Sequence, residues 1–251
     1  NQHLSNIQSN QEIWSSETKE HRASMLVHAA DKMLVRRNEF AVYITKETNK
    51  TLSESLADVD EAIDFLNYYA RSEIELGNLK ARGAFAIVAP WNFPLAIPCG
   101  MSVASLVAGN VTFLKSSNKA HFIAHKFVEL MHECGVPKSA LIHVHGDRHI
   151  GNILLSNEHI AGCVFTGSKK VGSDIIDKLS TRIITNNECT YQTKIIAETG
   201  GKNTIIVTQT ADMDEAISGV LYSAFAHAGQ KCSACSRVVV HKSIKKLFVE
   251  R

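Results

Sequence analysis

Residues 84–115 read AFAIVAPWNFPLAIPCGMSVASLVAGNVTFLK, and this stretch decides the fold. Its two apolar runs, AFAIVA and VTFLK, have the length and composition of buried strands, and the segment between them has room for a helix. Three further runs follow, ALIHVH, GCVF and TKIIA, each separated from the previous one by a helix-like segment. Parallel strands need crossovers of this length. The pattern therefore predicts an α/β fold with a Rossmann-like, doubly wound parallel sheet.

The chain on either side of these runs indicates two domains. Upstream, apolar residues recur at helical spacing in two sets: Leu26, Ala30, Met33 and Leu34, then Val59, Ile63, Leu66 and Ala70. Downstream, the alternation restarts with TIIVT, a helix across residues 212–228 and the strand RVVVH. We expect residues 1–198 to form a cofactor-binding domain with N-terminal helices. Residues 199–251 are expected to be the truncated start of a second α/β, catalytic domain, too short to bury a core of its own.

The composition excludes several classes of protein. A hydrophobic fraction of 45% and a charged fraction of 21% are typical of a globular protein. A net charge of +2 offers no one-signed surface for nucleic acid or anionic membrane, so a small-molecule partner is expected. The longest apolar stretch, residues 95–109, is too short and interrupted for a membrane span. Thiols in a reducing, cytoplasmic compartment are expected at all six cysteines: Cys99, Cys134, Cys163, Cys189, Cys232 and Cys235.

Polar motifs follow the predicted strands, at the edge where ligands of open α/β sheets bind. AFAIVA runs into PWNFP at residues 90–94, VTFLK ends in Lys115, and GCVF runs into TGS at residues 166–168. TKIIA runs into ETGG at residues 198–201, and the helix across residues 212–228 ends in GQKCSACSR. We therefore expect the functional groups to converge on one edge of the sheet.

The ordered set PWNFP, FTGS, ETGGKN and GQKCSACSR resembles the aldehyde dehydrogenase family, and the resemblance covers nearly the whole chain. It implies a Rossmann-like cofactor domain that lacks the usual G-x-G-x-x-G fingerprint, which is indeed missing from this sequence. It also implies NAD(P)-dependent oxidation of an aldehyde to an acid. DVDEAIDFLNYYARSEIEL and AFAHAGQKCSACSRVVV are most similar to glutamate-semialdehyde (1-pyrroline-5-carboxylate) dehydrogenases of proline catabolism, including the dehydrogenase module of bifunctional proline-utilisation proteins.

The resemblance implies three catalytic residues. Cys232 attacks the aldehyde carbon, and the Asn92 carboxamide, with the Cys232 backbone N–H, receives the charge that develops on the oxygen. Transfer of hydride to the nicotinamide leaves a thioester, and Glu198 then activates water as the general base, a role that suits a carboxylate of raised pKa. For the substrate, Ser233 is implied to hold the carboxylate and Phe93 to pack on the aliphatic stem.

NAD is the implied cofactor. Lys115 matches the family's ribose-binding lysine, and Ser168 matches the pyrophosphate-binding serine at a helix start, where free N–H groups favour phosphate. The rest of the implied cofactor site is Pro90, Trp91, Gly146 and Gly167. Asn118 stands where the family often has Glu, so NADP is not excluded. The turn His145-Gly146 replaces the usual Pro-Gly in a segment one residue shorter, which alters the adenine side.

The resemblance also bears on the whole protein. The chain stops before the family's later E-I-F-G-P motif and oligomerisation strands, so we interpret it as a fragment. At full length a homo-oligomer is implied, with a fused or partner proline dehydrogenase. A different aldehyde, or an inactive cofactor-binding fragment of such an enzyme, is the alternative function.

Structural roles are the alternative for single residues. Asn92 could cap the helix that follows it, Glu198 could merely sit in a turn, and Lys115 could be a solvated charge. Cys232 and Cys235 could form a redox or metal pair of the C-x-x-C type, but a zinc site needs four ligands and the sequence has no second such pair. A set of histidines could suggest a metal hydrolase: His121, His125, His143, His145 and His149. No acidic residue falls at ligand spacing from them, which argues against this function. We expect no metal.

Overall fold

The computed structural model describes residues 2–76, 80–185 and 190–251. The chain folds into two compact units that divide after Glu198. Cys189, one of the six predicted thiols, lies outside the described residues. The other five cysteines are free thiols, as expected. In the described residues, no helix is both long and apolar enough to cross a membrane.

Helices fill the first part of the chain, as the apolar periodicity predicts. Within residues 2–76 they are α1 (Gln2–Ser5), α2 (Ile7–Ser16), α3 (Lys19–Val35), α4 (Arg37–Thr48) and α5 (Leu52–Glu75). A capping box begins α5: the Thr51 side chain accepts the Glu54 amide, and the Glu54 side chain accepts the Thr51 amide. Leu26 and Leu66 are fully buried, whereas Leu34 is 57% exposed. The expectation for Leu34 was wrong, because this residue flanks the buried stripe of α3.

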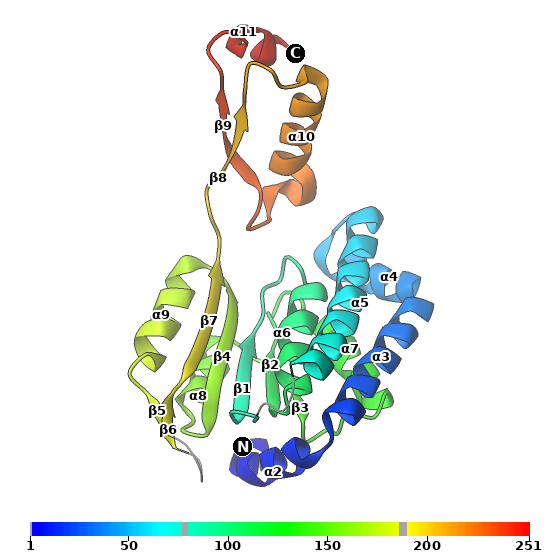
Figure 1. Cartoon of the computed structure of the whole chain (residues 1–251), viewed down its shortest axis with the longest axis vertical. Coiled ribbons are helices and arrows are strands. Elements are labelled where there is room, and N and C mark those ends of the chain that lie inside the picture. The colour runs from blue at the N-terminus through cyan, green and yellow to red at the C-terminus, as the bar shows by residue number, and fades with distance from the viewer. Residues whose placement is uncertain (1, 77–79, 186–189) are drawn as a thin grey trace. The chain divides into compact units, whose positions relative to one another are not determined.

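The predicted parallel sheet is confirmed in the first unit. Its described strands lie in the order β3-β2-β1-β4-β7 (Figure 1). Parallel pairing joins β1 to β2, β2 to β3 and β1 to β4. The strands lie at the five predicted runs: β1 (Ala84–Val88), β2 (Thr112–Lys115), β3 (Leu141–Val144), β4 (Ile160–Gly167) and β7 (Lys194–Thr199). The last two extend into the polar motifs that were expected to follow them, β4 through Gly167 and β7 through Thr199.

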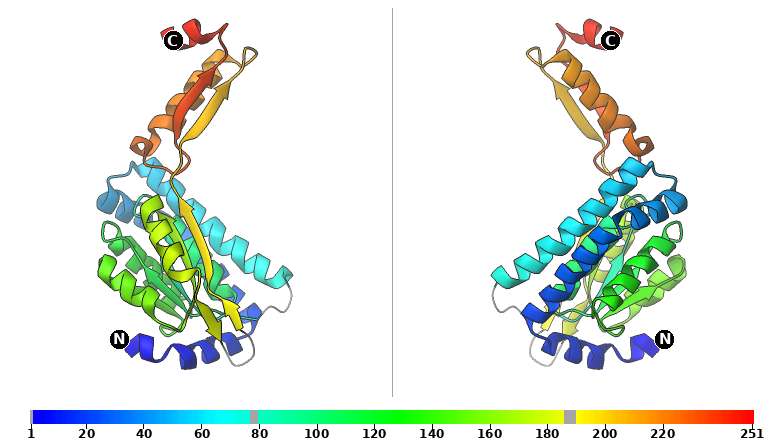
Figure 2. Two further views of the ribbon diagram at one scale, coloured as in Figure 1. Left: turned by 90° about the vertical axis from the view of Figure 1, so that its left-hand side faces the viewer. Right: turned by 90° about the vertical axis from the view of Figure 1, so that its right-hand side faces the viewer.

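Crossover helices cover both faces of this sheet. They are α6 (Ala96–Val107), α7 (His121–Glu133), α8 (Arg148–Ser156) and α9 (Lys169–Leu179). Right-handed crossovers put α6 and α7 on one face and α8 and α9 on the other. The helices α3 and α5 lie side by side in both views of Figure 2 and pack outside α6. The strand order and the two helical layers are those of a doubly wound fold.

The sequence patterns did not indicate a small hairpin that precedes β7. Its strands are β5 (Ile183–Thr185) and β6 (Thr190–Gln192), which pair antiparallel. The Arg182 guanidinium anchors the hairpin to the sheet unit by donating to the carbonyls of Leu155, Asn157 and Ile160. A three-residue strand is too short for its alternation to stand out in a sequence.

The second unit has the predicted strand, helix and strand. Its elements are β8 (Asn203–Val207), α10 (Met213–Phe225), a 3₁₀ turn (Ala226–Gly229), β9 (Cys235–Val240) and α11 (Lys245–Glu250). The strands pair in parallel, and the Asp212 carboxylate caps α10. Among its described hydrophobic residues only Val207 and Cys235 are buried, whereas Tyr222 and Phe225 are each 71% exposed. The expectation that this unit buries no core of its own is confirmed.

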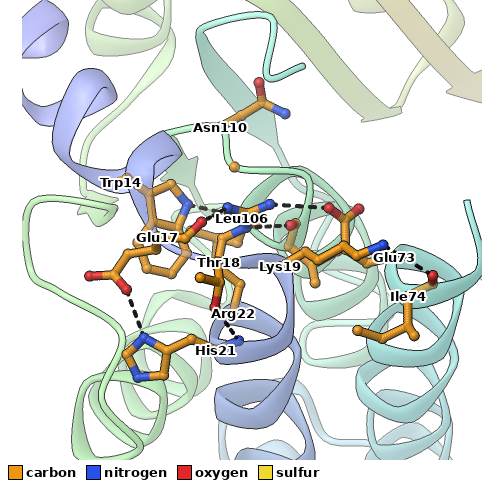
Figure 3. A network of polar contacts seen from close by, with 12 residues as sticks. Trp14, Glu17, Thr18, Lys19, His21, Arg22, Glu73, Ile74, Leu106 and Asn110 are labelled. Carbon is orange, nitrogen blue, oxygen red and sulfur yellow. Dashed lines mark hydrogen bonds and ion pairs between the residues drawn. The ribbon is translucent and has the colours of Figure 1, made fainter. Parts of the chain in front are cut away.

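A buried polar network ties the N-terminal helices to the C-terminal end of α6 (Figure 3). The Trp14 indole donates to the Leu106 carbonyl at 3.0 Å. The Arg22 guanidinium donates to the Val107 carbonyl at 2.7 Å and to the Glu73 carboxylate at 3.1 Å. Since α6 leads out of the loop that carries PWNFP, this network fixes the far end of the helix that supports the loop.

Arg22→Met should lower the free energy of unfolding by about 3–5 kcal/mol, because it leaves the Glu73 carboxylate buried without its cation. Urea denaturation measures the change. The matched control is Arg37→Met, which removes an exposed ion pair with Asp60 and should have a much smaller effect. Equal losses in the two variants would contradict a special role for the buried network.

Candidate active site

The ends of four strands meet at one edge of the sheet. Val88 pairs with Lys115 in β2 and with Phe165 in β4, and Lys115 pairs with Val144 in β3. The Ala89 amide donates to the Lys115 carbonyl at 3.1 Å, so the pairing continues just beyond β1. The segments that follow these strands therefore begin at a common edge. They include PWNFP, residue 146 and residues 167–168.

The PWNFP loop is held by a residue that is distant in the sequence. The first amide of α6, at Ala96, donates to the Asp58 carboxylate of α5 at 2.7 Å. Asp58 thus performs the capping that was considered as the alternative role of Asn92, and the residue directly before α6 is Leu95. The Phe93 ring lies 4.2 Å from the Lys50 ammonium. The loop is thus anchored on both sides of Asn92, by the Ala89 amide before it and by Phe93 and Ala96 after it.

The predicted cofactor residues in this unit suit an anionic dinucleotide. Lys115 is half-buried at the end of β2, and burial lowers the pKa of its ammonium, a shift that Asp147 opposes. Ser168 caps α9 by accepting the Val171 amide, as expected, so the first turn of this helix presents N–H groups at the edge. Gly167 lies so close to the Phe165 ring that a Cβ there would come within 2.7 Å of it. The Lys115 ammonium and the N–H groups of α9 are donors of the kind that bind a diphosphate.

Two other predicted cofactor positions have defined local geometry. Gly146 has a φ of +143°, which L side chains rarely adopt, and a Cβ there would come within 2.5 Å of Ile150. The Lys119 ammonium lies over the Trp91 ring, 5.5 Å from its centroid. Both positions therefore depend on the residue type that the sequence provides.

Glu198 lies in β7, at the wall of a cavity of about 340 Å³ within the first unit. The cavity lies between α5, α6 and the sheet, and it is lined mainly by apolar side chains: Phe65, Tyr69, Phe85, Ile97, Met101, Val164 and Ile196. Among the described lining residues, Glu198 carries the only charge. The alternative that Glu198 merely sits in a turn is wrong, because this residue belongs to a strand.

Cys232 lies in a turn of the second unit, between α10 and β9. Among the five described cysteines it alone is exposed; the other four are buried. The Asn203 carboxamide donates to the Cys232 carbonyl at 2.6 Å and to the Ala234 carbonyl at 3.3 Å. Asn203 belongs to the ETGGKN motif, so one predicted motif holds the turn of another. The sequence analysis did not identify this contact, since nothing local connects residues 203 and 232.

The predicted site residues are divided between the two units. Asn92, Phe93, Lys115, Ser168 and Glu198 belong to the first, together with the other predicted cofactor residues. Cys232 and Ser233 belong to the second. The convergence of Cys232 with Asn92 and Glu198 stays a prediction.

Four of the five histidines considered as metal ligands lie together beside the end of β3. The rings of His121 and His145 are 4.5 Å apart, and those of His125 and His143 are 5.8 Å apart. The Nε2 atom of His143 is 2.8 Å from the Ser116 hydroxyl. Burial, with smaller contributions from the other three imidazoles, lowers the pKa of His143 to about 4. In the described part of the chain, no three His, Cys, Asp or Glu side chains are arranged to hold a metal ion.

Comparison with known proteins identifies related sequences. The sequence model of the "Aldehyde dehydrogenase family" matches residues 1–251. The "1-pyrroline-5-carboxylate dehydrogenase" of Bacillus subtilis (strain 168) is 38% identical over 95% of this chain and 49% of its own length. The protein of that name from Oceanobacillus iheyensis is 39% identical over the same shares. The chain thus spans about half the length of the curated relatives that it matches.

Solved structures are similar as well. The 1-pyrroline-5-carboxylate dehydrogenase from Thermus with bound NAD superimposes with a TM-score of 0.92 at 33% identity, over 99% of this chain and 51% of that one. Proline utilization A from Bdellovibrio bacteriovorus superimposes with a TM-score of 0.93 at 35% identity, over 100% of this chain and 27% of that one.

The histidine group makes stability depend on pH. His143 titrates near 6.5 when unfolded but at about 4 when folded, so between these values the unfolded chain binds more protons. The contribution of His143 to stability is fully present above pH 6.5 and is lost as the pH drops through 4, a loss on the order of 1–3 kcal/mol once solvent screening is allowed for. Unfolding of wild type and His143→Gln across this range measures it. Between pH 6.5 and 4, His143→Gln should lose less stability than wild type, while the exposed control His149→Gln should follow wild type; parallel curves for all three would contradict the assignment.

Proposed function

Since this chain belongs to the aldehyde dehydrogenase family, we propose that the protein oxidises L-glutamate γ-semialdehyde to L-glutamate with NAD, by covalent catalysis at Cys232. The relatives named 1-pyrroline-5-carboxylate dehydrogenase support the choice of substrate, and the neighbour with bound NAD supports the choice of cofactor. We propose this activity for the full-length gene product, since the chain spans about half the length of these relatives.

One observation carries the assignment of the nucleophile. Cys232 is exposed on a turn that Asn203 holds by two hydrogen bonds, whereas the other four described thiols are buried. Burial raises the pKa of Cys99 above its ordinary range and raises the pKa of Cys163 to about 12, so neither supplies a thiolate near neutral pH. An accessible thiol in a fixed turn is what nucleophilic attack requires.

The first step forms a carbon–sulfur bond. The Cys232 thiolate attacks the aldehyde carbon, and the carbonyl electron pair moves to the oxygen. The Asn92 carboxamide and the Cys232 backbone N–H donate to this oxyanion. A donor of this kind commonly contributes about 3 kcal/mol to stabilising the transition state. The anchors on both sides of Asn92 suit this role, since a donor that is already oriented needs no reorganisation during the reaction.

Oxidation and release follow. NAD, when bound, supplies the acceptor for the hydride that leaves the tetrahedral carbon as the C=O bond forms again. Lys115 and the N-terminus of α9 would hold its ribose and diphosphate, at the edge where Gly146 and Gly167 also lie. Glu198 would take a proton from water, whose oxygen attacks the thioester; the carbon–sulfur bond breaks, and the thiolate is regenerated with release of the acid.

Further parts of the proposal concern recognition and assembly. Ser233 directly follows the nucleophile and would hold the substrate carboxylate, and the Phe93 ring would pack on the aliphatic stem. The structural neighbours described as proline utilization A support a fused or separate proline dehydrogenase partner. A homo-oligomer and a cytoplasmic location complete the proposal, with NADP as the alternative to NAD.

Cys232→Ala in the full-length gene product should lower the rate of glutamate-semialdehyde oxidation by more than about a thousandfold and leave NAD affinity unchanged, because the thiol acts only in the chemistry. Glu198→Gln should keep a burst of reduced cofactor and slow the subsequent turnover. Stopped-flow absorbance of reduced nicotinamide and calorimetric titration of NAD measure the two effects.

Cys235→Ala is the matched control, since it removes a buried thiol three residues away and should keep the burst. Unchanged oxidation in Cys232→Ala would sink the proposed nucleophile. The absence of any burst in Glu198→Gln would mean that this carboxylate acts before hydride transfer. Wild-type protein that binds NAD but oxidises no aldehyde would favour the alternative of a cofactor-binding piece.

A further inference from the structure

A buried ion pair lies behind the PWNFP loop and takes no part in the chemistry described above. The Lys50 ammonium lies 2.7 Å from the Asp58 carboxylate, and the two side chains are 1% and 0% exposed. Charged side chains are seldom buried so completely unless they are paired. Burial raises the pKa of the Asp58 carboxyl, while Lys50 and the amides of Ala96 and Leu95 oppose that shift.

The local sequence fixes the place of Lys50. Asn49, with a left-handed φ of 58°, ends α4, and Thr51 begins α5 with its capping box. Lys50 is therefore the one residue between two helix caps, and its backbone has little freedom. Asp58 projects from the second turn of α5, which returns past this cap and carries the carboxylate back to the ammonium.

Both members of the pair contact the chain just after Asn92. The Lys50 ammonium lies over the Phe93 ring at 4.2 Å, a cation–π contact in a desolvated setting. The other carboxylate oxygen of Asp58 accepts the Ala96 amide at 2.7 Å. Pro94, between these contacts, has its φ fixed by its ring. On the other side of Asn92, the Ala89 amide bonds to β2.

Stability gives no sufficient reason for charges at this position. Replacing a buried ion pair with apolar side chains is often neutral or stabilising. A charged pair instead restricts orientation. The Lys50 ammonium faces both the Asp58 carboxylate and the Phe93 ring, and the Asp58 carboxylate faces both that ammonium and the Ala96 amide. These demands fix the segment of residues 93–96 relative to α5.

We propose that Lys50 and Asp58 are positioning residues that aim the Asn92 carboxamide at the oxyanion, by holding the Phe93 ring and the first turn of α6. This inference rests on the proposed function. Asn92 is one peptide unit from Phe93, so movement of the ring is passed directly to the carboxamide. A misplacement of about 1 Å at a reacting centre costs about a hundredfold in rate.

Kinetics of the full-length gene product tests the inference first. Lys50→Met should lower kcat by about 10- to 100-fold, with an unchanged KM for NAD and an unchanged rate of Cys232 alkylation by iodoacetamide. Lys46→Met is the matched control: it makes the same substitution at an exposed lysine of α4, four residues earlier, and should leave kcat unchanged. A loss in Lys50→Met that falls equally on kcat, NAD binding and alkylation would indicate a merely structural role and overturn the proposal.

A double-mutant cycle with Asn92 gives the sharper result. If Lys50 acts through Asn92, Lys50→Met should cause almost no further loss of kcat in an Asn92→Ala background. Multiplication of the two separate losses would overturn the proposal. Lys50→Met with Asp58→Asn is the second variant, because it removes the pair without leaving a lone buried charge and keeps an acceptor for the Ala96 amide; it should show the same kcat loss and the same cycle.

A measurement that needs no activity separates this inference from the proposed function. The chain has two tryptophans, and Trp91 is adjacent to Asn92, so protein labelled with fluorotryptophan reports on the loop. Lys50→Met should shift or broaden the Trp91 fluorine resonance, assigned by Trp91→Phe, and leave that of Trp14 in place. An unchanged Trp91 resonance overturns the positioning role even if wild type is active. If wild type is inactive but Lys50→Met shifts the Trp91 resonance, the proposed function is overturned, and with it the role of Asn92 at an oxyanion. Lys50 would in that case still anchor the loop.

Discussion

The parallel pairing of β1 with both β2 and β4 is the constraint on which the rest depends. Parallel strands in register end at the same edge, so residues that are far apart in the sequence begin their loops side by side. Val88, Lys115, Val144 and Phe165 share this register. The register of the backbone hydrogen bonds thus brings the PWNFP loop, the half-buried lysine and the capped N-terminus of α9 to one edge, where side-chain contacts hold them.

Much of this arrangement could be predicted because its signals are local. Each strand of the main sheet is a short apolar run, and each crossover is long enough to form a helix, so the fold class followed from spacing. Ser168 could be assigned as a helix cap because a serine before a helical pattern is a capping signal. The helical stripes were predictable for the same reason, although Leu34 at the edge of one stripe is exposed.

The supports of the site could not be predicted, because they join distant residues. Asp58 binds an amide 38 positions later, and Asn203 binds a carbonyl 29 positions later. The buried Lys50 resembles any other lysine in the sequence, and only the packing of α5 against α6 gives it a role. The first amide of α6 is capped by Asp58, a residue of another helix, and no local pattern indicates that contact.

The second unit exposes Ile206, Tyr222 and Phe225, each 71% accessible, and an apolar surface of this kind marks a site of further contact. The proposed function requires that its Cys232 turn and the edge of the first unit form one active site. A crystal structure of the full-length gene product with NAD and a glutamate-semialdehyde adduct on Cys232 tests it most directly. We expect the adduct oxygen within about 3 Å of the Asn92 carboxamide, and Glu198 in the same cleft. An adduct that faces away from Asn92, with Glu198 on another face of the molecule, would contradict it.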